Sequence, residues 1–379
     1  MPFCFHKCHY CDFYSITRQS PQRMTRFVDL LLDEARLWAT ADVRPRTVFF
    51  GGGTPSLLPW DEMRRLIRGL RHCFDCSQCD EWTVEANPAT VTEDYCRMLR
   101  QEGVTRMSFG AQSFAPTELK TLERHHETQD VPRSLELART AGFQRLNVDL
   151  IYAIPGQTMD SWRQSLEMAI ELGTPHVSCY CLTYEPNTPL AVRKRMGLIQ
   201  PAKEELELQM GTHARKRLAE GERPAYEVSN FALPGEECRH NLLYWTGGDY
   251  VGLGPSAASH VQGWRWKNRP HLGEWEVAVS AGQLPASEVE QLSPLHRAGE
   301  LAMLLLRLSR GLELEFFQNK TGLDAMELFS DPIERFTRAG LLQPDQHAVR
   351  LAEPGWPVAD GIAAEFLAAA RREEELAPR

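Results

Sequence analysis

Short apolar runs alternate with amphipathic stretches over the first half of this 379-residue chain. The runs are rich in β-branched and aromatic residues, which favour strands. Each intervening stretch repeats its apolar residues at the spacing of one helix face. Strands that alternate with helices form parallel sheets with helical crossovers, so the sequence predicts an α/β fold. The predicted strands are residues 47–50, 82–85, 106–109, 146–151 and 176–182, and the predicted helices are residues 24–39, 61–71, 93–100, 131–141 and 161–172.

Polar residues cluster where the predicted strands end. Glycines at 51–53 end the first strand, Glu85 ends the second, Gln112 follows the third and Asp149 lies late on the fourth. In a partial barrel or a doubly wound sheet, which this pattern fits equally, ligands bind at the carboxyl ends of the strands. A glycine turn or a lone carboxylate is weak evidence of a site, but the shared position predicts one.

Three cysteines near the start of the chain, Cys4, Cys8 and Cys11, are separated by three and then two residues. Thiolates suit iron–sulfur clusters and zinc. A cubane cluster held by only three cysteines leaves one iron open to another ligand, which is the interpretation that we favour. A zinc site completed by His6 or His9, or a set of free thiols, is the alternative.

Composition limits the partners and the compartment. The formal net charge of −9 argues against nucleic-acid binding. No apolar run is long enough to cross a membrane. Ten cysteines without a signal peptide predict a reducing, cytoplasmic environment.

The residues from Cys4 to Ser15 (CFHKCHYCDFYS) resemble the signature of the radical S-adenosylmethionine superfamily. Tyr10 before the last cysteine and the CDFYS tail are similar to the oxygen-independent coproporphyrinogen III oxidase group, and within it to HemW-type haem chaperones. The likeness extends over nearly the whole chain. It implies a partial (β/α)6 barrel and one 4Fe-4S cluster on Cys4, Cys8 and Cys11. The open iron would bind an exchangeable S-adenosylmethionine.

The resemblance also implies roles for the residues at the strand ends. Gly52, Gly53 and Thr54 match the segment that binds the amino group of S-adenosylmethionine, and Glu85 matches an acid in the same site. The other matched residues surround the ribose and carboxylate (Gln112, Arg124, Asp149) or the adenine (Tyr10, Ile151).

A histidine in the second half of the chain is a candidate haem ligand. A histidine beside aromatic residues, such as His240 near Tyr244 and Trp245, is usually a packed core residue. However, the run His240-Asn241-Leu-Leu-Tyr244-Trp245 resembles the motif implicated in haem binding in HemW-type proteins. Relatives often carry a second histidine where this chain has Ala258. The aromatic residues at 264–266 are candidates to cover a porphyrin, or to lie in the core.

Two functions of different class follow from the resemblance. One is a haem chaperone that transfers haem to an unidentified acceptor protein. The other is an oxidase that decarboxylates coproporphyrinogen III by abstracting hydrogen from a propionate. The oxidase signature has a fourth cysteine where this chain has Phe13, and an amino-terminal extension that this sequence lacks. Both differences favour the chaperone. A radical enzyme with another substrate and a homodimeric state are left open.

Three domains are expected. They are a barrel at residues 1–190, an intermediate region at 191–286 with the His240–Trp245 motif, and a small helical, winged-helix-like domain at 287–379 that we interpret as a lid or docking surface. Relatives begin with an apolar strand before the first cysteine, whereas this sequence starts with Met1-Pro2-Phe3-Cys4. Either the recorded start lies too far downstream or the first barrel strand is absent, and without that strand we expect the cysteine loop to be loosely anchored.

A second trio, Cys73, Cys76 and Cys79, has two residues in each gap. It joins a predicted helix to a strand on the amino-terminal side of the sheet, away from the predicted site. We therefore interpret it as structural thiols, with metal binding as the alternative.

Overall fold

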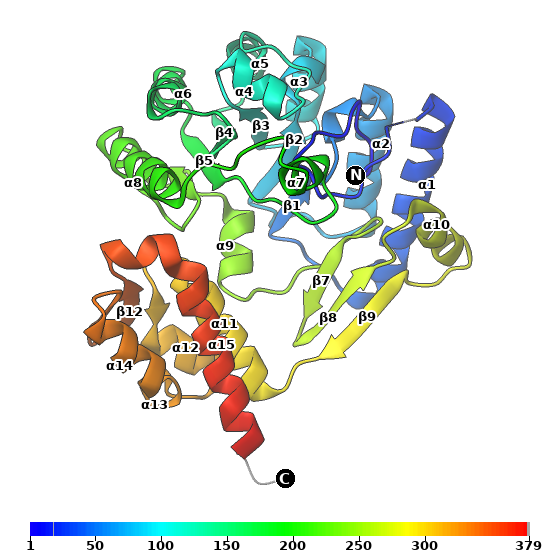
Figure 1. Ribbon diagram of the computed structural model, residues 1–379. Coiled ribbons are helices and arrows are strands. Elements are labelled where there is room, and N and C mark those ends of the chain that lie inside the picture. The colour runs from blue at the N-terminus through cyan, green and yellow to red at the C-terminus, as the bar shows by residue number, and fades with distance from the viewer. Residues whose placement is uncertain (18, 377–379) are drawn as a thin grey trace.

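A computed structural model describes residues 1–17 and 19–376 of the chain (Figure 1). Its main element is a six-stranded sheet with the order β1-β2-β3-β4-β5-β6. Neighbouring strands from β1 to β5 are parallel, and β6 pairs antiparallel with β5. The predicted α/β class and partial barrel are confirmed, while β6 was not predicted from the sequence. The strands are β1 (Thr47–Phe50), β2 (Glu81–Ala86), β3 (Arg106–Gln112), β4 (Arg145–Tyr152), β5 (His176–Cys181) and β6 (Asn230–Ala232).

Helices cover the outer face of this sheet (Figure 1). In α2, for example, Met63, Leu66, Ile67 and Leu70 form one buried stripe, at the spacing of a single helix face. These stripes pack on outward-facing strand residues to form the larger hydrophobic core. The covering helices are α1 (Pro21–Trp38), α2 (Trp60–Cys73), α3 (Glu93–Gln101), α5 (Asp130–Thr140), α6 (Met159–Glu171) and α8 (Glu204–Glu220), with the short helix α4 (Pro116–Thr121) after β3.

Successive side chains of a strand point to opposite faces of the sheet. Here the apolar ones face the helices, and polar ones face the inner side. On β4, Leu146 and Val148 belong to the outer core, whereas Asp149 lines a cavity on the inner side. The amide of Asn147 donates to Ser108 Oγ at 2.7 Å and to Asp149 Oδ1 at 2.8 Å. Such hydrogen bonds satisfy polar groups that would otherwise be costly to bury.

Residues 1–3 run beside the end of β1. The backbone N–H of Gly53 donates to Met1 O at 2.6 Å, and that of Thr54 donates to Phe3 O at 2.7 Å. The Phe3 side chain is 1% exposed and meets the Phe27 ring edge-on at 5.2 Å. The expectation of a loosely anchored cysteine loop is therefore wrong, because backbone hydrogen bonds and a buried ring hold its amino side.

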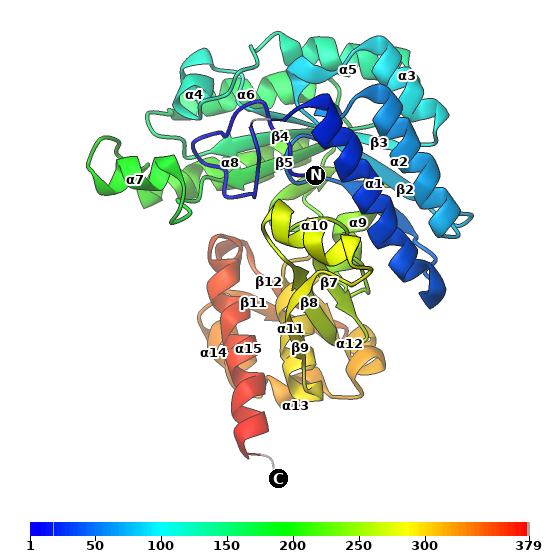
Figure 2. The same cartoon turned by 90° about the vertical axis from the view of Figure 1, so that its right-hand side faces the viewer.

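The region after the barrel contains a second sheet and a connecting helix. Strands β7 (Ala258–Val261), β8 (Trp264–Asn268) and β9 (Ala286–Gln291) form an antiparallel sheet. Trp266 stacks on Trp38 of α1 at 5.6 Å, so it serves packing. Helix α9 (Arg239–Trp245) lies between the large sheet and the C-terminal region (Figures 1 and 2). Helices α7 (Pro189–Arg195) and α10 (Leu272–Ser280) complete this part.

The C-terminal region has its own hydrophobic core. A three-stranded antiparallel sheet packs with a set of helices, which confirms the winged-helix-like prediction. The long last helix was not predicted. The predicted domain boundaries after residues 190 and 286 stay a prediction. The elements are α11 (Pro294–Leu306), β10 (Leu312–Glu313), α12 (Leu314–Thr321), α13 (Ala325–Leu328), α14 (Ser330–Arg338), β11 (Leu342–Pro344), β12 (Ala348–Leu351) and α15 (Ala359–Leu376).

Membrane-spanning helices were searched for in the described ranges. No helix among residues 1–17 and 19–376 combines the length and the apolar character needed to cross a bilayer.

Candidate functional site

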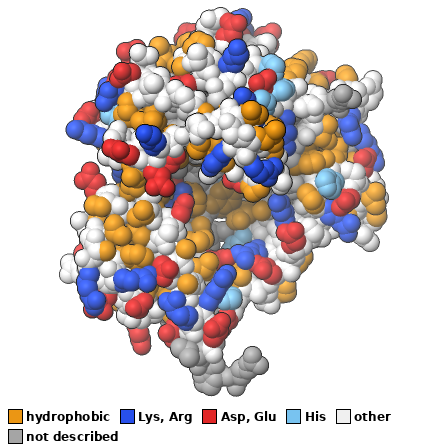
Figure 3. Space-filling view, in the orientation of Figure 1, with side chains coloured by type: hydrophobic (Ala, Val, Ile, Leu, Met, Phe, Trp, Pro, Cys, Tyr) orange, Lys and Arg blue, Asp and Glu red, His pale blue; other side chains and the backbone are white. Residues whose placement is uncertain are grey.

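One large cavity, of about 900 Å³, lies on the inner side of the sheet. Figure 3 shows a hollow near the middle of the molecule with hydrophobic side chains inside it. The cavity brings together every site residue predicted from the sequence except His240. These lining residues are Cys4, Cys8, Tyr10, Cys11, Gly52, Gly53, Thr54, Glu85, Gln112, Arg124, Asp149 and Ile151.

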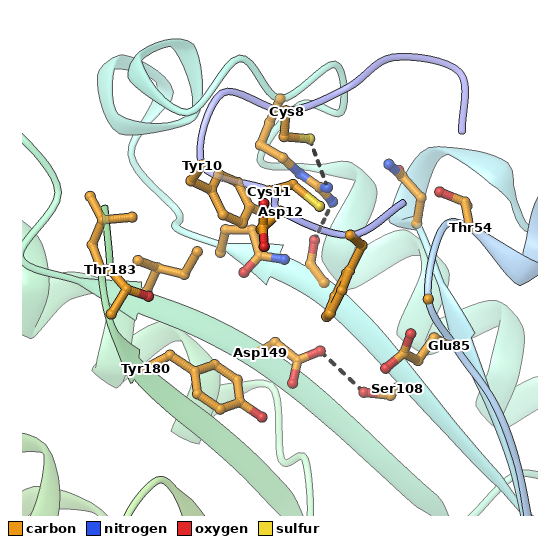
Figure 4. Close-up of a pocket in the computed structure, with 18 of the residues that line it drawn as sticks. Cys8, Tyr10, Cys11, Asp12, Thr54, Glu85, Ser108, Asp149, Tyr180 and Thr183 are labelled. Carbon is orange, nitrogen blue, oxygen red and sulfur yellow. Dashed lines mark hydrogen bonds between the residues drawn. The ribbon is translucent and has the colours of Figure 1, made fainter. Parts of the chain in front are cut away.

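The three cysteines lie on a loop that is closed at its base. The backbone N–H of Cys4 donates to Ile16 O at 3.1 Å, and that of Ile16 donates to Pro2 O at 2.6 Å. At its far end, His9 N–H donates to Leu122 O at 3.2 Å. Because both the base and the tip are hydrogen-bonded, the thiols are presented on a defined surface above the strand ends (Figure 4).

Each thiol faces the cavity in a different setting. Thr54 Oγ1 donates to Cys4 Sγ at 3.6 Å, and Arg124 Nη1 donates to Cys8 Sγ at 3.6 Å. Burial raises the pKa of the Cys4 and Cys11 thiols, so a metal would have to displace their protons. No group of three or more His, Cys, Asp or Glu side chains in the described ranges converges as a single metal ion would require. A cubane binds each cysteine at a different iron, so its three thiolates need not meet at one point.

Arg124 is a central contact of the site. Its Nη2 donates to Gly110 O at 2.6 Å and its Nε to His126 Nδ1 at 3.3 Å, besides the contact with Cys8. Burial, and then the charge of Arg124, lower the pKa of His126 to about 4, so this imidazole is neutral and accepts. The guanidinium therefore ties the cysteine loop to the end of β3. A ligand carboxylate that binds Arg124 would have to share its guanidinium nitrogens with these three partners.

Two carboxyl groups, Glu85 and Asp149, lie on the cavity wall (Figure 4). Burial, and then the charge of Asp149, raise the pKa of Glu85 to about 8. Burial also raises the pKa of Asp149, although Ser108 donates to its Oδ2 at 3.1 Å and further hydrogen bonds oppose the shift. A cation in the cavity would favour ionisation of both groups. The wall is therefore suited to a positively charged ligand.

The glycines at 51–53 allow close approaches that a side chain would block. A Cβ on Gly51 would lie 2.9 Å from Glu85 Oε2, and a Cβ on Gly53 would lie 2.7 Å from Phe3 O. Gly52 has a φ of +102°, which residues with a side chain rarely adopt. The run thus brings backbone next to both Glu85 and the cysteine loop.

Gln112 and Tyr10 also line the cavity. Gln112 follows a register shift in β3 and has a φ of 66°, a strained conformation of a kind that concentrates at functional sites. Tyr10 packs with Ile151 and Leu182 in a small apolar cluster. This cluster offers an apolar surface to a flat ring, next to the polar strand ends.

His240 is placed outside the cavity lining. Its Nδ1 hydrogen-bonds Thr47 Oγ1 at 2.8 Å, its Nε2 hydrogen-bonds the Tyr244 hydroxyl at 2.8 Å, and its ring stacks on Phe49 at 5.0 Å. Burial lowers the pKa of His240 to about 4. The Glu81 carboxylate accepts from the His240 backbone N–H at 3.0 Å and so caps α9. Iron could bind this imidazole only after one of its hydrogen bonds is broken, and haem ligation by His240 stays a prediction.

Several lining residues were not identified from the sequence. Ser108 could have been found, because strand alternation places it on the same face as Asp149 of the next strand. No local signal marks Arg307 or Trp356, which reach the cavity from the C-terminal region. The residues missed include Ser108, Tyr180, Val228, Ser229, Arg307, Trp356 and Asp360.

The second cysteine trio lies apart from the cavity. Cys73 ends α2, and Cys76 and Cys79 precede β2. All three side chains pack against the larger core. Burial raises the pKa of Cys76 to about 11, which disfavours the thiolate needed for metal binding.

Comparisons with known proteins agree with this geometry. The radical SAM superfamily matches residues 1–169, and the HemN C-terminal domain matches residues 292–358. The haem chaperone HemW of Lactococcus lactis is 33% identical over 97% of this chain and 96% of its own length. That of Escherichia coli is 38% identical over 69% of this chain and 68% of its own length.

A solved structure shows the same fold. The radical SAM enzyme coproporphyrinogen III oxidase (HemN) from Escherichia coli superposes with a TM-score of 0.83 over 97% of this chain and 88% of its own, at 22% identity. At that identity the likeness extends to the fold alone. The sequence relatives carry the assignment further, and the chain belongs to the HemW family of the radical SAM superfamily.

Proposed function

We propose that this protein is a haem chaperone, which binds haem and transfers it to an acceptor protein. The observation that carries the proposal is the near full-length likeness to proteins named haem chaperone HemW. The cavity supports it, because about 900 Å³ is at the upper end of ordinary ligand sites and leaves room beyond a single cofactor.

Cys4, Cys8 and Cys11 would hold one 4Fe-4S cluster in this proposal. They share one cavity and one closed loop, whereas the other cysteine in the cavity lining, Cys181, lies on a different element at the end of β5. This donor set fits a cubane with one open iron. When bound, the cluster would supply a site for an exchangeable S-adenosylmethionine and a source of electrons.

The strand ends would hold S-adenosylmethionine. Glu85 and Asp149 suit its positive charge, and Tyr10 with Ile151 suits its adenine. Gly52, Gly53 and Thr54 would face its amino group. Gln112 and Arg124 would lie near its ribose and carboxylate. Each of these roles depends on the family likeness together with the position of the residue in the cavity.

The absence of a fourth cysteine at position 13 supports a protein that carries haem rather than an enzyme of haem synthesis. Phe13 stands there, 63% exposed at the cavity. An aromatic side chain adds apolar surface at the entrance and no ligand. This favours a chaperone over an oxidase of coproporphyrinogen III.

Anaerobically reconstituted protein distinguishes the two functions. We expect stoichiometric haem binding by absorbance titration with haemin, and transfer to apo-haem protein in a second step. With coproporphyrinogen III, S-adenosylmethionine and dithionite, we expect no protoporphyrinogen IX. Formation of that product would overturn the chaperone proposal in favour of the oxidase.

The cluster assignment has a matched control. Cys8→Ser should abolish the cluster, measured as iron and sulfide per chain, because it removes one of the proposed ligands. Cys76→Ser changes a thiol of the second trio and should leave the iron content unchanged. The opposite result would show that the second trio carries the cluster.

His240 is tested by spectroscopy. His240 remains our proposed haem ligand, on the condition that the hydrogen bond between its Nε2 and the Tyr244 hydroxyl is broken. His240→Ala should then shift the Soret band of the haem complex. An unchanged band would remove His240 from the haem site without affecting the chaperone proposal.

A further inference from the structure

The cavity has two chemically different ends. The cysteine loop and the strand ends form one end, and residues from the C-terminal region and from the loop before β6 form the other. This second end, which we call the lower end, is lined by Val228, Ser229, Arg307, Trp356, Pro357 and Asp360. The roles proposed above for the cluster and S-adenosylmethionine use residues of the upper end only, so the lower end is free for another ligand.

Arg307 provides the positive charge at the lower end. It is the C-cap residue of α11, and its side chain is 20% exposed. The guanidinium lies 4.7 Å from the centre of the Trp245 ring, which holds it by a cation–π contact. Its Nε is buried and makes no hydrogen bond within the described chain. A guanidinium on a cavity wall is suited to a carboxylate oxygen.

Two acidic residues contact this guanidinium, and they differ in exposure. Glu227 is fully buried, and its Oε2 lies 3.9 Å from Nη2, which is longer than a hydrogen bond. Asp360 accepts from Nη1, but its side chain is 87% exposed. An exposed ion pair contributes little stability, so a ligand carboxylate can replace Asp360 at small cost. Glu227 would stay as the permanent partner.

The same end carries apolar surface for a flat ring. Trp356 lines the cavity beside Pro357, and its ring is supported by the Arg215 guanidinium at 3.4 Å. An aromatic face next to a positive fork matches a planar macrocycle that carries carboxylates on its edge.

We infer that Arg307 binds a propionate of the haem carried by this protein, with Trp356 against the macrocycle. The inference rests on the proposed chaperone function and names the residues that hold its cargo. Trp245 becomes a positioning residue, because it fixes the guanidinium from the side of α9. This gives the aromatic end of the His240–Trp245 motif a role that does not require contact with iron.

Esterification of the propionates tests the charge contact without any variant. Haemin dimethyl ester keeps the iron and the macrocycle of haemin but carries neutral methyl esters in place of the two propionates. Wild-type protein should bind haemin at least about tenfold more tightly than the ester, which corresponds to about 1.4 kcal/mol. Equal affinities would overturn the inference. Failure of both compounds to bind would overturn the chaperone function itself, so the two failures are distinguishable.

Substitution then locates the contact. Arg307→Gln should weaken haemin binding about tenfold, leave ester binding unchanged and so abolish the preference. Arg310→Gln is the matched control, because Arg310 is 48% exposed, pairs with Glu313 and does not line the cavity. It should keep the wild-type preference. A preference that persists in Arg307→Gln would place the propionate elsewhere.

Substitution of Asp360, which competes with a haem propionate for Arg307, tests whether the propionate replaces it. Asp360→Asn removes the charge that a propionate would displace, so haemin should bind more tightly while ester binding stays the same. Asp360 is exposed, so this variant should fold even if Arg307→Gln does not. Unchanged or weaker binding of haemin to Asp360→Asn would contradict the proposed exchange.

Discussion

Arg124 Nη1 donates to the sulfur of Cys8 at 3.6 Å, while Nη2 of the same guanidinium donates to the Gly110 carbonyl at 2.6 Å. A single side chain thus joins the middle cysteine of the loop to the end of β3. Figure 4 shows Cys8 above the side chains of Glu85 and Asp149. The loop is held over the strand ends by this contact as well as by its own backbone.

Arg124→Gln should therefore impair assembly of the cluster. The shorter, neutral side chain cannot span both partners, so Cys8 is held less well and its thiolate loses a nearby positive charge. We expect clearly lower iron and sulfide content after reconstitution and weaker binding of S-adenosylmethionine. Arg133→Gln, on the exposed side of α5, should match wild type. Full iron content in Arg124→Gln would show that the backbone alone positions the loop.

Binding of S-adenosylmethionine should depend on pH through Glu85. The pKa of Glu85 is raised to about 8 in the ligand-free cavity, so at pH 7 this carboxyl is mostly protonated. A cationic ligand favours the ionised form, so binding releases a proton and the affinity should rise with pH up to about 8. The slope below that point should approach a factor of about ten per pH unit. Equilibrium dialysis of reconstituted protein between pH 6.5 and 9 measures it.

Glu85→Gln should bind more weakly and with little pH dependence, whereas Glu93→Gln on α3 should retain the wild-type slope. A pH-independent affinity in the wild-type protein would show that Glu85 does not face the positive charge of the ligand.

Gly53→Ala should loosen the amino side of the cysteine loop. The added Cβ would lie 2.7 Å from Phe3 O and 2.9 Å from Met1 O, and both are backbone atoms that cannot rotate away. We expect a loss of about 1–3 kcal/mol in the free energy of unfolding, together with faster loss of iron from the reconstituted protein. Gly273→Ala is the control, since a Cβ there meets nothing within 4 Å in helix α10. Equal behaviour of the two variants would disprove the close packing at Gly53.

His240→Gln should reduce the sensitivity of the fold to acid. The pKa of His240 is lowered to about 4 in the folded protein, below the value of about 6.5 in an unfolded chain. Between these values the unfolded chain takes up the proton first, so stability present above pH 6.5 is lost as the pH falls towards 4. From pH 7 to 5 this group should cost the wild-type fold about 2 kcal/mol. Urea unfolding at both pH values should show a correspondingly smaller loss in His240→Gln.

The same loss in both proteins would mean that His240 is solvated and not held by Thr47 and Tyr244. His176→Gln offers a second check, because that imidazole is fully buried and its pKa is also lowered by burial.

Much of the barrel could be predicted from local pattern. The alternation of apolar runs with amphipathic helices is written into neighbouring residues, so all five parallel strands were identified. The strand-end residues from Gly52 to Asp149 were placed together correctly, because parallel strands bring their carboxyl ends to one edge whatever their loops do. Strand β6 escaped prediction because it is three residues long and is defined only by its pairing with β5.

The amino acid sequence by itself determined the sheet, the cysteine spacing and the residues at the strand ends, because each depends on contacts between near neighbours or on a periodic pattern. Only the tertiary structure decided that residues 1–3 anchor the cysteine loop, that His240 is engaged on both ring nitrogens, and that Arg307 reaches the cavity. These depend on packing between segments up to roughly 200 residues apart, such as the 193-residue separation of Thr47 and His240. No local pattern encodes such contacts, because they form only when segments that are distant in the sequence pack together in the folded chain.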